Sequence, residues 1–192
     1  MNKPLSILIL LLICSCASQK YKTIDFGQFE ITVPEKWNKY ERKGIDSYVG
    51  GMITDKKDTL NFDLGRYSGD VSTDFPMVYN EETLAELSNR ERKLLPKTKH
   101  LITEDWSSED IDLRDYLKYD IEYDTIACFR VKIIRPRNKG FGASGIYIDS
   151  MSGIKKKYDK TKFNFYGKFL SEKTQTEFIK ALKTLRFEKY CE

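Results

Sequence analysis

Residues 116–124 read YLKYDIEYD, and this stretch decides the fold class because apolar and charged side chains alternate along it. Apolar residues at every second position from Leu117 to Tyr123 have the two-residue period of a β-strand with one buried face. Three β-rich runs follow: IACFRVKIIRP at 126–136, ASGIYIDSM at 143–151 and KFNFYGKFL at 162–170. The turn-forming sequence RPRNKGFG separates two of these runs, so we expect consecutive antiparallel strands.

Upstream of this stretch, the sequence predicts a further strand and a hairpin. Phe29, Ile31 and Val33 alternate with polar residues, and Pro34 ends the run because proline cannot donate to a β-ladder. Trp37 follows this strand, and we expect it to pack in the core. The predicted hairpin consists of YVGGMIT at 48–54, the charged turn DKKD at 55–58, and TLNFDLGRYS at 59–68.

Two stretches have the residue spacing of amphipathic helices. NEETLAELSNRERKLL, at 80–95, begins with Asn80 as an N-cap and stops before Pro96. SEKTQTEFIKALKTLRF, at 171–187, has Ser171 and Thr174 as candidate caps. The apolar stripe of this second helix is Phe178, Ile179, Leu182 and Leu185.

These elements together predict one α+β domain over residues 24–192, a length that fits a single domain. We expect a mostly antiparallel β-sheet flanked by two main helices. The charge balance is nearly even, with 33 Lys and Arg residues against 29 Asp and Glu residues. Domains that bind nucleic acid usually have clustered basic residues and a clearly basic balance, so we expect no nucleic-acid partner.

The order of the predicted elements resembles the PsbP-like α/β/α sandwich. The resemblance covers residues 24–188 and rests on element order, on the Pro34-x-x-Trp37 spacing in ITVPEKW, and on FIKALKTLRF at the end of the last helix. This family includes small bacterial envelope lipoproteins related to DcrB, and its members mostly bind partners. The resemblance therefore implies a binding role and transfers no catalytic or metal-binding residue, because proteins of one fold perform unrelated tasks.

The first residues, MNKPLSILILLLICSC, have the layout of a bacterial lipoprotein signal. The apolar run from Leu5 to Ile13 is too short to cross the ~30 Å hydrocarbon core of a bilayer. ICSC at 13–16 resembles a lipobox, in which an aliphatic residue and a small residue precede the lipidated cysteine. We therefore predict a signal peptide over residues 1–15 and a lipidated Cys16, followed by a tether up to residue 23.

This signal predicts that the protein is a lipoprotein of the bacterial cell envelope, anchored to a membrane through Cys16. Diacylglycerol and a further acyl chain such as palmitate anchor stably, whereas a single chain binds membranes only marginally. Ala17 and Ser18 lack the aspartate that retains some lipoproteins at the inner membrane, which favours the outer membrane. A CxC pair with one distant histidine fits neither a four-ligand zinc site nor a CxxC redox motif.

Two cysteines, Cys128 and Cys191, remain in the mature chain. Export places them where a disulfide persists, and two cysteines allow one intramolecular pairing. The alternative is that Cys128 is a buried small apolar residue and Cys191 a free thiol near the terminus. Both interpretations stay open at the level of sequence, because pairing requires a Cα separation below ~7 Å.

The remaining candidates for functional residues have ordinary alternatives. His100 is the one histidine, and without a nucleophile motif beside it we expect a surface residue. Asp110-x-Asp112 is a fragment of a calcium loop that lacks the glycine, so we expect a solvated acidic face and no metal. The candidate contacts with a partner or a membrane are Trp106, Lys155, Lys156 and Lys157.

Sequence alone therefore predicts a non-catalytic binding or assembly module without a cofactor, which contacts an envelope protein. The alternative is an envelope protein that binds a ligand or cation, with a hydrolase as a weaker third interpretation.

Overall fold

The structure is a computed structural model that describes residues 20–72, 75–105, 111–152 and 160–187. Its strands are β1 (Tyr21–Asp25), β2 (Glu30–Pro34), β3 (Asn38–Glu41), β4 (Ser47–Ile53), β5 (Thr59–Gly65), β6 (Val78–Tyr79), β7 (Leu101–Ile102), β8 (Tyr119–Ile126), β9 (Phe129–Pro136), β10 (Ala143–Ser152) and β11 (Thr161–Lys168). Its helices are α2 (Glu81–Glu86), α3 (Asn89–Leu94) and α4 (Glu172–Leu182), with short 3₁₀ helices η1 (Leu95–Lys97) and η2 (Leu113–Tyr116).

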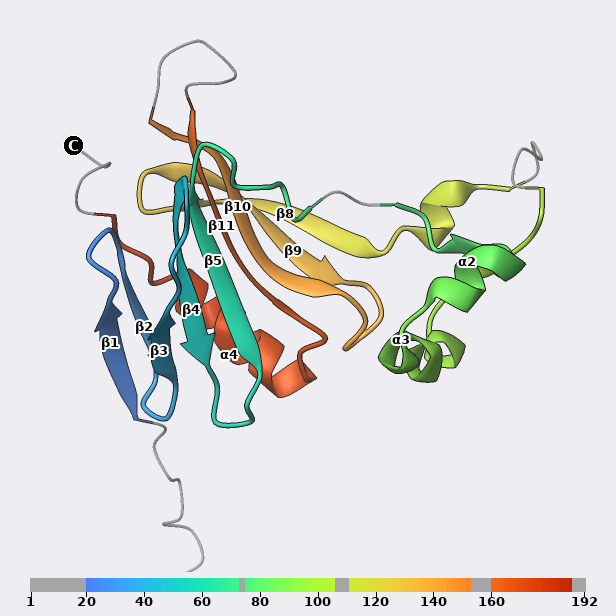
Figure 1. Ribbon diagram of the computed structural model, residues 1–192, viewed down its shortest axis with the longest axis horizontal. Coiled ribbons are helices and arrows are strands. Elements are labelled where there is room, and N and C mark those ends of the chain that lie inside the picture. Colours follow the sequence, from blue (N-terminus) through green and yellow to red (C-terminus); the bar gives the residue numbers. More distant parts are fainter. Residues whose placement is uncertain (1–19, 73–74, 106–110, 153–159, 188–192) are drawn as a thin grey trace, which may run out of the picture.

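Seven strands form one antiparallel sheet in the order β3-β4-β5-β11-β10-β9-β8 (Figure 1). The predicted hairpin is confirmed, because β4 and β5 pair along their whole length. The consecutive strands predicted from residue 116 onward are also confirmed, as β8, β9, β10 and β11 are neighbours in the sheet. The chain therefore has an α+β fold built mostly on antiparallel sheet.

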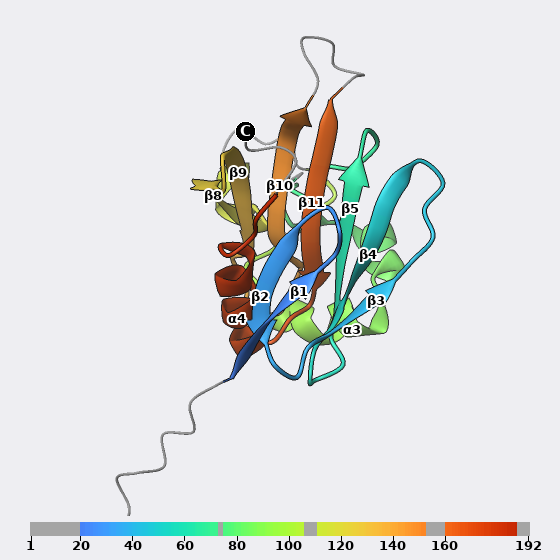
Figure 2. The same cartoon turned by 90° about the vertical axis from the view of Figure 1, so that its left-hand side faces the viewer.

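One face of this sheet, which we call the core face, is covered by the β1–β2 hairpin and α4 (Figure 2). The backbone N–H of Thr32 in β2 donates to Thr184 Oγ1 at 2.8 Å, which joins the hairpin to the end of α4. Phenylalanine rings from β5, β11 and α4 meet on this face, and Phe165 lies 5.3 Å from Phe178 between ring centroids. Trp37 is fully buried in the same cluster, as predicted.

The closing helix is confirmed as α4. Of the two candidate caps, Ser171 is the N-cap, and its side chain accepts a hydrogen bond from the backbone N–H of Thr174. Phe178, Ile179 and Leu182 are buried against the sheet, which is the stripe that the residue spacing predicted. Among the described residues, no helix is long and apolar enough to cross a membrane.

The prediction of one continuous helix over residues 80–95 is wrong. Asn80 caps α2 as predicted, but the backbone at Leu87 is extended and Ser88 begins a second helix, α3. Ser88 and Glu91 form a capping box, with the Ser88 N–H donating to Glu91 Oε2 at 3.0 Å, and this local signal interrupts the helix. Neither helix has a buried residue, so α4 is the one helix described that contributes to the core.

The expected burial of the apolar side of residues 117–123 is also wrong. These residues do form most of β8, but Ile121 is 39% exposed and Tyr123 is 55% exposed. β8 is the last strand of the sheet, and Tyr123 pairs with Lys132, which alternates with buried Val131 and Ile133 on β9. Ile121 and Tyr123 therefore lie on the face opposite those buried side chains. Alternation therefore predicted the strand correctly, but it did not predict what packs against it.

The domain begins earlier than residue 24. Tyr21, Lys22 and Thr23, which the sequence analysis assigned to the tether, belong to β1 and pair with β2. The structure thus leaves residues 17–20 between Cys16 and the first strand.

Candidate functional site

Several residues singled out from the sequence lie outside the described part of the chain. These residues are Cys16, Trp106, Asp110, Lys155, Lys156, Lys157 and Cys191. The lipid anchor and the partner contacts assigned to them stay predictions. Cys128 is described, and it is disulfide-bonded in the turn between β8 and β9. Its bonding partner lies outside the described residues, so the pairing with Cys191 also stays a prediction.

His100 has ordinary local contacts. Its Nδ1 lies 3.2 Å from Thr98 Oγ1 and 3.0 Å from the Thr98 carbonyl oxygen, and its ring meets Tyr79 edge-on. His100 is half-buried, so the expectation of a surface residue is met only in part.

Asp112 is engaged by its neighbour Arg114. The Arg114 Nε and Nη2 donate to the Asp112 carboxylate at 2.9 and 2.8 Å, and these hydrogen bonds hold the pKa of that carboxyl below its usual value. Within the described residues, no group of three or more His, Cys, Asp and Glu side chains could hold a metal ion.

The face of the sheet opposite the core face, which we call the open face, carries a row of polar side chains that the sequence analysis missed. Strand register aligns Asp63 of β5 with Asn164 of β11, Asn164 with Tyr147 of β10, and Tyr147 with Lys132 of β9. Each of these residues alternates with a buried apolar residue on its strand. The row therefore arises from the two-residue period of four neighbouring strands.

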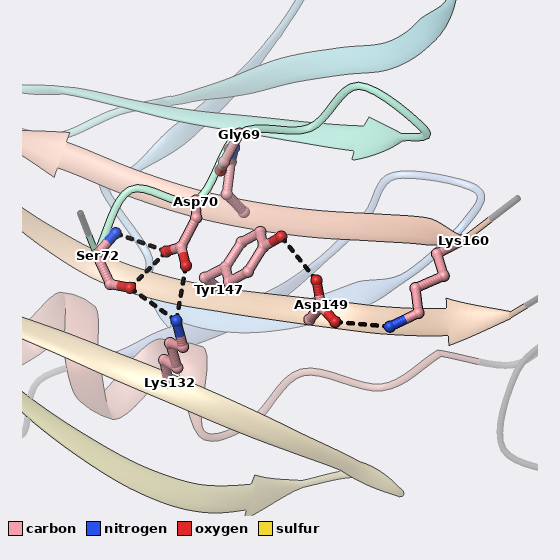
Figure 3. Close-up of polar contacts among 8 residues, drawn as sticks. Gly69, Asp70, Ser72, Lys132, Tyr147, Asp149 and Lys160 are labelled. Carbon is pink, nitrogen blue, oxygen red and sulfur yellow. Dashed lines mark hydrogen bonds and ion pairs between the residues drawn. The ribbon is translucent and has the colours of Figure 1, made fainter. Parts of the chain in front are cut away.

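A loop after β5 closes one part of this row (Figure 3). Lys132 Nζ donates to Asp70 Oδ2 at 2.6 Å, and both side chains are about 30% exposed. Burial alone would raise the pKa of Asp70, but hydrogen bonds from Lys132 and Ser72 outweigh it and lower that pKa. Asp70 and Lys132 thus neutralise each other and hold the loop against β9.

Tyr147 lies in the middle of the row and is also satisfied. Its hydroxyl donates to Asp149 Oδ1 at 3.2 Å, and Lys160 Nζ donates to Asp149 Oδ2 at 2.8 Å (Figure 3). Burial, and then the charge of Asp149, raises the pKa of Tyr147 far above its ordinary value. The hydroxyl therefore stays protonated and acts as a hydrogen-bond donor.

Asn164 is as deeply buried as Tyr147, and each of the two side chains is 4% exposed. Its Nδ2 donates to the Gly69 carbonyl oxygen at 2.9 Å. This acceptor fixes the orientation of the amide, because a flipped amide would place two oxygens together. The Asn164 Oδ1 is buried and accepts no hydrogen bond from any residue that the structure describes.

Asp63, directly across from Asn164, is the least satisfied charged group of the row. Its Oδ1 is buried, and among the described residues no donor reaches it. Burial raises the pKa of the Asp63 carboxyl, and a hydrogen bond from Ser47 offsets this increase only in part. A half-buried carboxylate without a cationic partner is costly, so its presence requires a reason.

Asp63 and Asn164 line a pocket of about 370 Å³ on the open face. Exposed Arg42 lies at its rim, and Asn61, whose Oδ1 accepts a hydrogen bond from Tyr40 at 2.6 Å, lies beside Asp63 on the same strand. The lining residues are Arg42, Val49, Asn61, Phe62, Asp63, Gly69, Asp70, Val71, Asn164 and Tyr166. The pocket thus offers the carboxylate of Asp63, beside the lysine-paired Asp70, and a guanidinium at its rim.

The sequence contains a weak signal for this pocket. Asp63 in LNFDLG and Asn164 in KFNFYG are polar residues inside otherwise aromatic or aliphatic strands. Sequence could place both on the face away from the core, but not beside each other, because β5 and β11 are about 100 residues apart and pair only in the folded sheet.

Comparison with known proteins adds no family to this description. No protein-family model matches the chain, and a search of curated proteins found no match.

Proposed function

We propose that the chain is a lipid-anchored protein of the bacterial cell envelope whose single α+β domain binds a small ammonium compound and catalyses no reaction. The anchor is proposed at Cys16, from the lipobox pattern in the sequence. The binding site is the open-face pocket around Asp63 and Asn164.

One observation carries the binding proposal: Asp63 is a half-buried carboxylate in a pocket, and no described cation offsets its burial. An ammonium group placed there supplies the missing positive charge and hydrogen-bond donors. Charge-assisted hydrogen bonds of this kind are about twice as strong as neutral ones. Because Arg42 lies at the rim, a ligand that also carries a carboxylate satisfies both ends, so zwitterions should bind more tightly than simple amines.

The absence of catalysis is part of the proposal and is supported by the pocket's composition. Its described lining contains no serine, cysteine, histidine or lysine, so it offers no nucleophile–base pair. His100 is not among the lining residues, and its ring contacts Thr98 and Tyr79.

We also propose that the fold is a variant of the PsbP-like sandwich. The β1–β2 hairpin that leads into Trp37, the central antiparallel sheet and the closing helix α4 support this assignment. An experimental structure that superposes on members of that family over the sheet and α4 would establish it, and a different strand order would exclude it.

The binding proposal is tested by NMR titration of the mature protein with methylammonium, glycine and β-alanine, following the side-chain amide of Asn164. We expect saturable shifts of that amide, with β-alanine or glycine binding more tightly than methylammonium. Asp63→Asn should abolish the shifts, whereas Asp55→Asn, an exposed residue in the β4–β5 turn, should leave them unchanged. Equal shifts in both variants, or none in the parent, would remove the proposal.

The anchor is tested separately by intact mass spectrometry of protein extracted from membranes. We expect a chain that starts at Cys16 and carries acyl mass. Cys16→Ser should yield unprocessed or soluble protein without that mass. A chain that starts elsewhere without acyl mass contradicts the anchor and leaves the pocket unaffected.

A further inference from the structure

The pairing of the strands places several turns at the same end of the molecule as the start of β1. We call this end the tether end. Tyr21 pairs with Pro34 across β1–β2, Ile53 lies opposite both Asn38 and Thr59, and Ala143 lies opposite Lys168. Lys22 Nζ also donates to Asn38 Oδ1 at 3.2 Å, and Lys56 Nζ to Ser171 Oγ at 3.4 Å. The segments of the tether end are 20–22, 34–38, 53–59, 137–142 and 168–173. The first strand, β1, begins at this end (Figure 1).

The tether end is basic and largely solvent-exposed. Its segments contain nine Lys and Arg residues against four Asp and Glu residues, and all but two of these charged residues are exposed. Arg137 and Lys173 pair with Asp120 and Glu177 outside these segments, and Lys139 pairs with Glu172 within them. Six basic residues remain against three acidic ones, so a positive excess remains after pairing. Tyr21 and Ile53 add two exposed apolar side chains at the same end. Lysines beside aromatic and aliphatic side chains suit the headgroup region of an anionic membrane.

The length of the tether sets how far this end can lie from a membrane. Four residues separate Cys16 from Tyr21, so the Cα atoms of these two residues lie at most ~18 Å apart at ~3.3–3.6 Å per residue. The headgroup layer takes up ~5–8 Å of that span, which leaves ~10 Å. This is about one Debye length at physiological ionic strength, so charges at the tether end interact with the lipid surface.

The opposite end of the sheet, which we call the distal end, lies too far away for that interaction. β11 has eight residues and is therefore ~26 Å long at ~3.3 Å per residue. Ser152 pairs with Thr161 where β10 ends and β11 begins, and these strand ends are at the distal end (Figures 1 and 2). The loop with Ile45 and the turn with Tyr67, both exposed, are at the same end.

We propose that the tether end docks on an anionic phospholipid surface and holds the sheet upright on the membrane. This proposal rests on the proposed anchor at Cys16. It assigns membrane contact to Lys36, Lys56 and their neighbours in place of the 155–157 lysines considered from the sequence. It also directs the distal end, with Ile45 and Tyr67, away from the bilayer.

The proposal is tested by hydrogen exchange of the mature, lipidated protein on vesicles of phosphatidylcholine, with or without ~30% phosphatidylglycerol. We expect slower exchange at residues 34–38 and 53–59 on the anionic vesicles alone, with the effect lost in high salt because surface charges are screened. Residues 41–47 and 65–70 should exchange equally on both vesicles.

A matched pair of variants separates docking from general charge effects. Lys36→Glu with Lys56→Glu should remove the protection at the tether end. Lys43→Glu with Arg66→Glu makes the same charge change in exposed segments of the distal end and should leave the protection intact. Protection at the distal end, or equal exchange on both vesicles, would overturn the docking proposal. Failure of the protein to float with neutral vesicles would instead refute the anchor, and the docking proposal with it.

Discussion

The two faces of the central sheet are built by alternate residues of the same strands, yet they are stabilised in different ways. On the core face, Phe62 and Phe165 belong to a cluster of aromatic rings with several neighbours each. On the open face, Asp63 and Asn164 depend on specific partners, and each keeps one oxygen without a donor among the described residues. The core face therefore tolerates little loss of volume, whereas the open face is sensitive to charge and hydrogen bonding.

The largest effect is expected on the core face. Phe165 is fully buried and meets the rings of Phe29, Phe62, Phe163 and Phe178. Phe165→Ala leaves a cavity among these rings and should lower the free energy of unfolding by about 3–5 kcal/mol. Urea denaturation measures this loss, and Tyr166→Ala on the same strand is the control. A loss in Phe165→Ala no larger than in the control would show that the ring cluster does not govern stability.

The disulfide of Cys128 is expected to have the next largest effect. Phe187 packs on Phe129 and Phe163, and it lines the same hollow as Cys128. Phe187 is four positions before Cys191 in the sequence. We expect a disulfide bond between Cys128 and Cys191 beside this hollow. Cys128→Ala should then cost about 2–4 kcal/mol of unfolding free energy.

Peptide mapping without reductant identifies the partner of Cys128 directly. A peptide that joins Cys128 to another cysteine, or two alkylatable thiols in the native protein, would contradict the pairing with Cys191.

On the open face, the largest loss should follow removal of Lys132. Lys132→Met leaves Asp70 without its ion-pair partner and should cost about 1–2 kcal/mol, less than a fully buried pair because both side chains keep some exposure. Because the folded pKa of Asp70 is lowered, this stability is present above the unfolded pKa of about 4 and is lost as pH falls through the folded value. The difference between parent and variant should therefore shrink in urea denaturation at low pH. Lys36→Met, at an exposed position, should show no such difference at any pH.

The smallest effect has the opposite sign. Asp63→Asn removes a half-buried charge and allows the new amide to donate to Asn164 Oδ1, so stability at neutral pH should rise by about 1 kcal/mol. Because the folded pKa of Asp63 is raised, the parent is penalised above that pKa, and the gain should fade as pH falls toward the unfolded value of about 4. Thermal unfolding of parent and variant from pH 3 to 8 measures this gain in stability, with Asp55→Asn as the control. A less stable Asp63→Asn would mean that the carboxylate stabilises the fold and has no need of a ligand.

The pKa values of the two carboxylates on the open face are thus shifted in opposite directions. Asp70 has a lysine partner, and its pKa is lowered. Asp63 has no such partner described, and its pKa is raised. For each residue, the measured quantity is the stability of the parent minus that of the variant. If this difference rose with pH for both Asp63 and Asp70, Asp63 would behave as a paired carboxylate and the binding proposal would lose its basis.

Local patterns in the sequence predicted the elements well where neighbouring residues decide the structure. Strand periodicity placed β4, β5 and β8 to β11, and the caps at Asn80 and Ser171 are where the sequence predicted them. The same local logic, applied to Ser88 and Glu91, would have predicted the break between α2 and α3, because a capping box begins a new helix. The apolar spacing continues across Leu87 and Ser88, so by itself it does not indicate this break.

The sequence by itself determined most strands of the central sheet, the closing helix, the α+β class and the alternation that gives each strand a polar and an apolar side, because these depend on residues a few positions apart. The tertiary structure decided that the apolar side of β8 stays exposed, which lysines lie near the tether, and that Asp63 lies beside Asn164. These features depend on strand order, and strand order results from the combined packing of α4, the β1–β2 hairpin and the aromatic cluster. No short stretch of sequence contains that information.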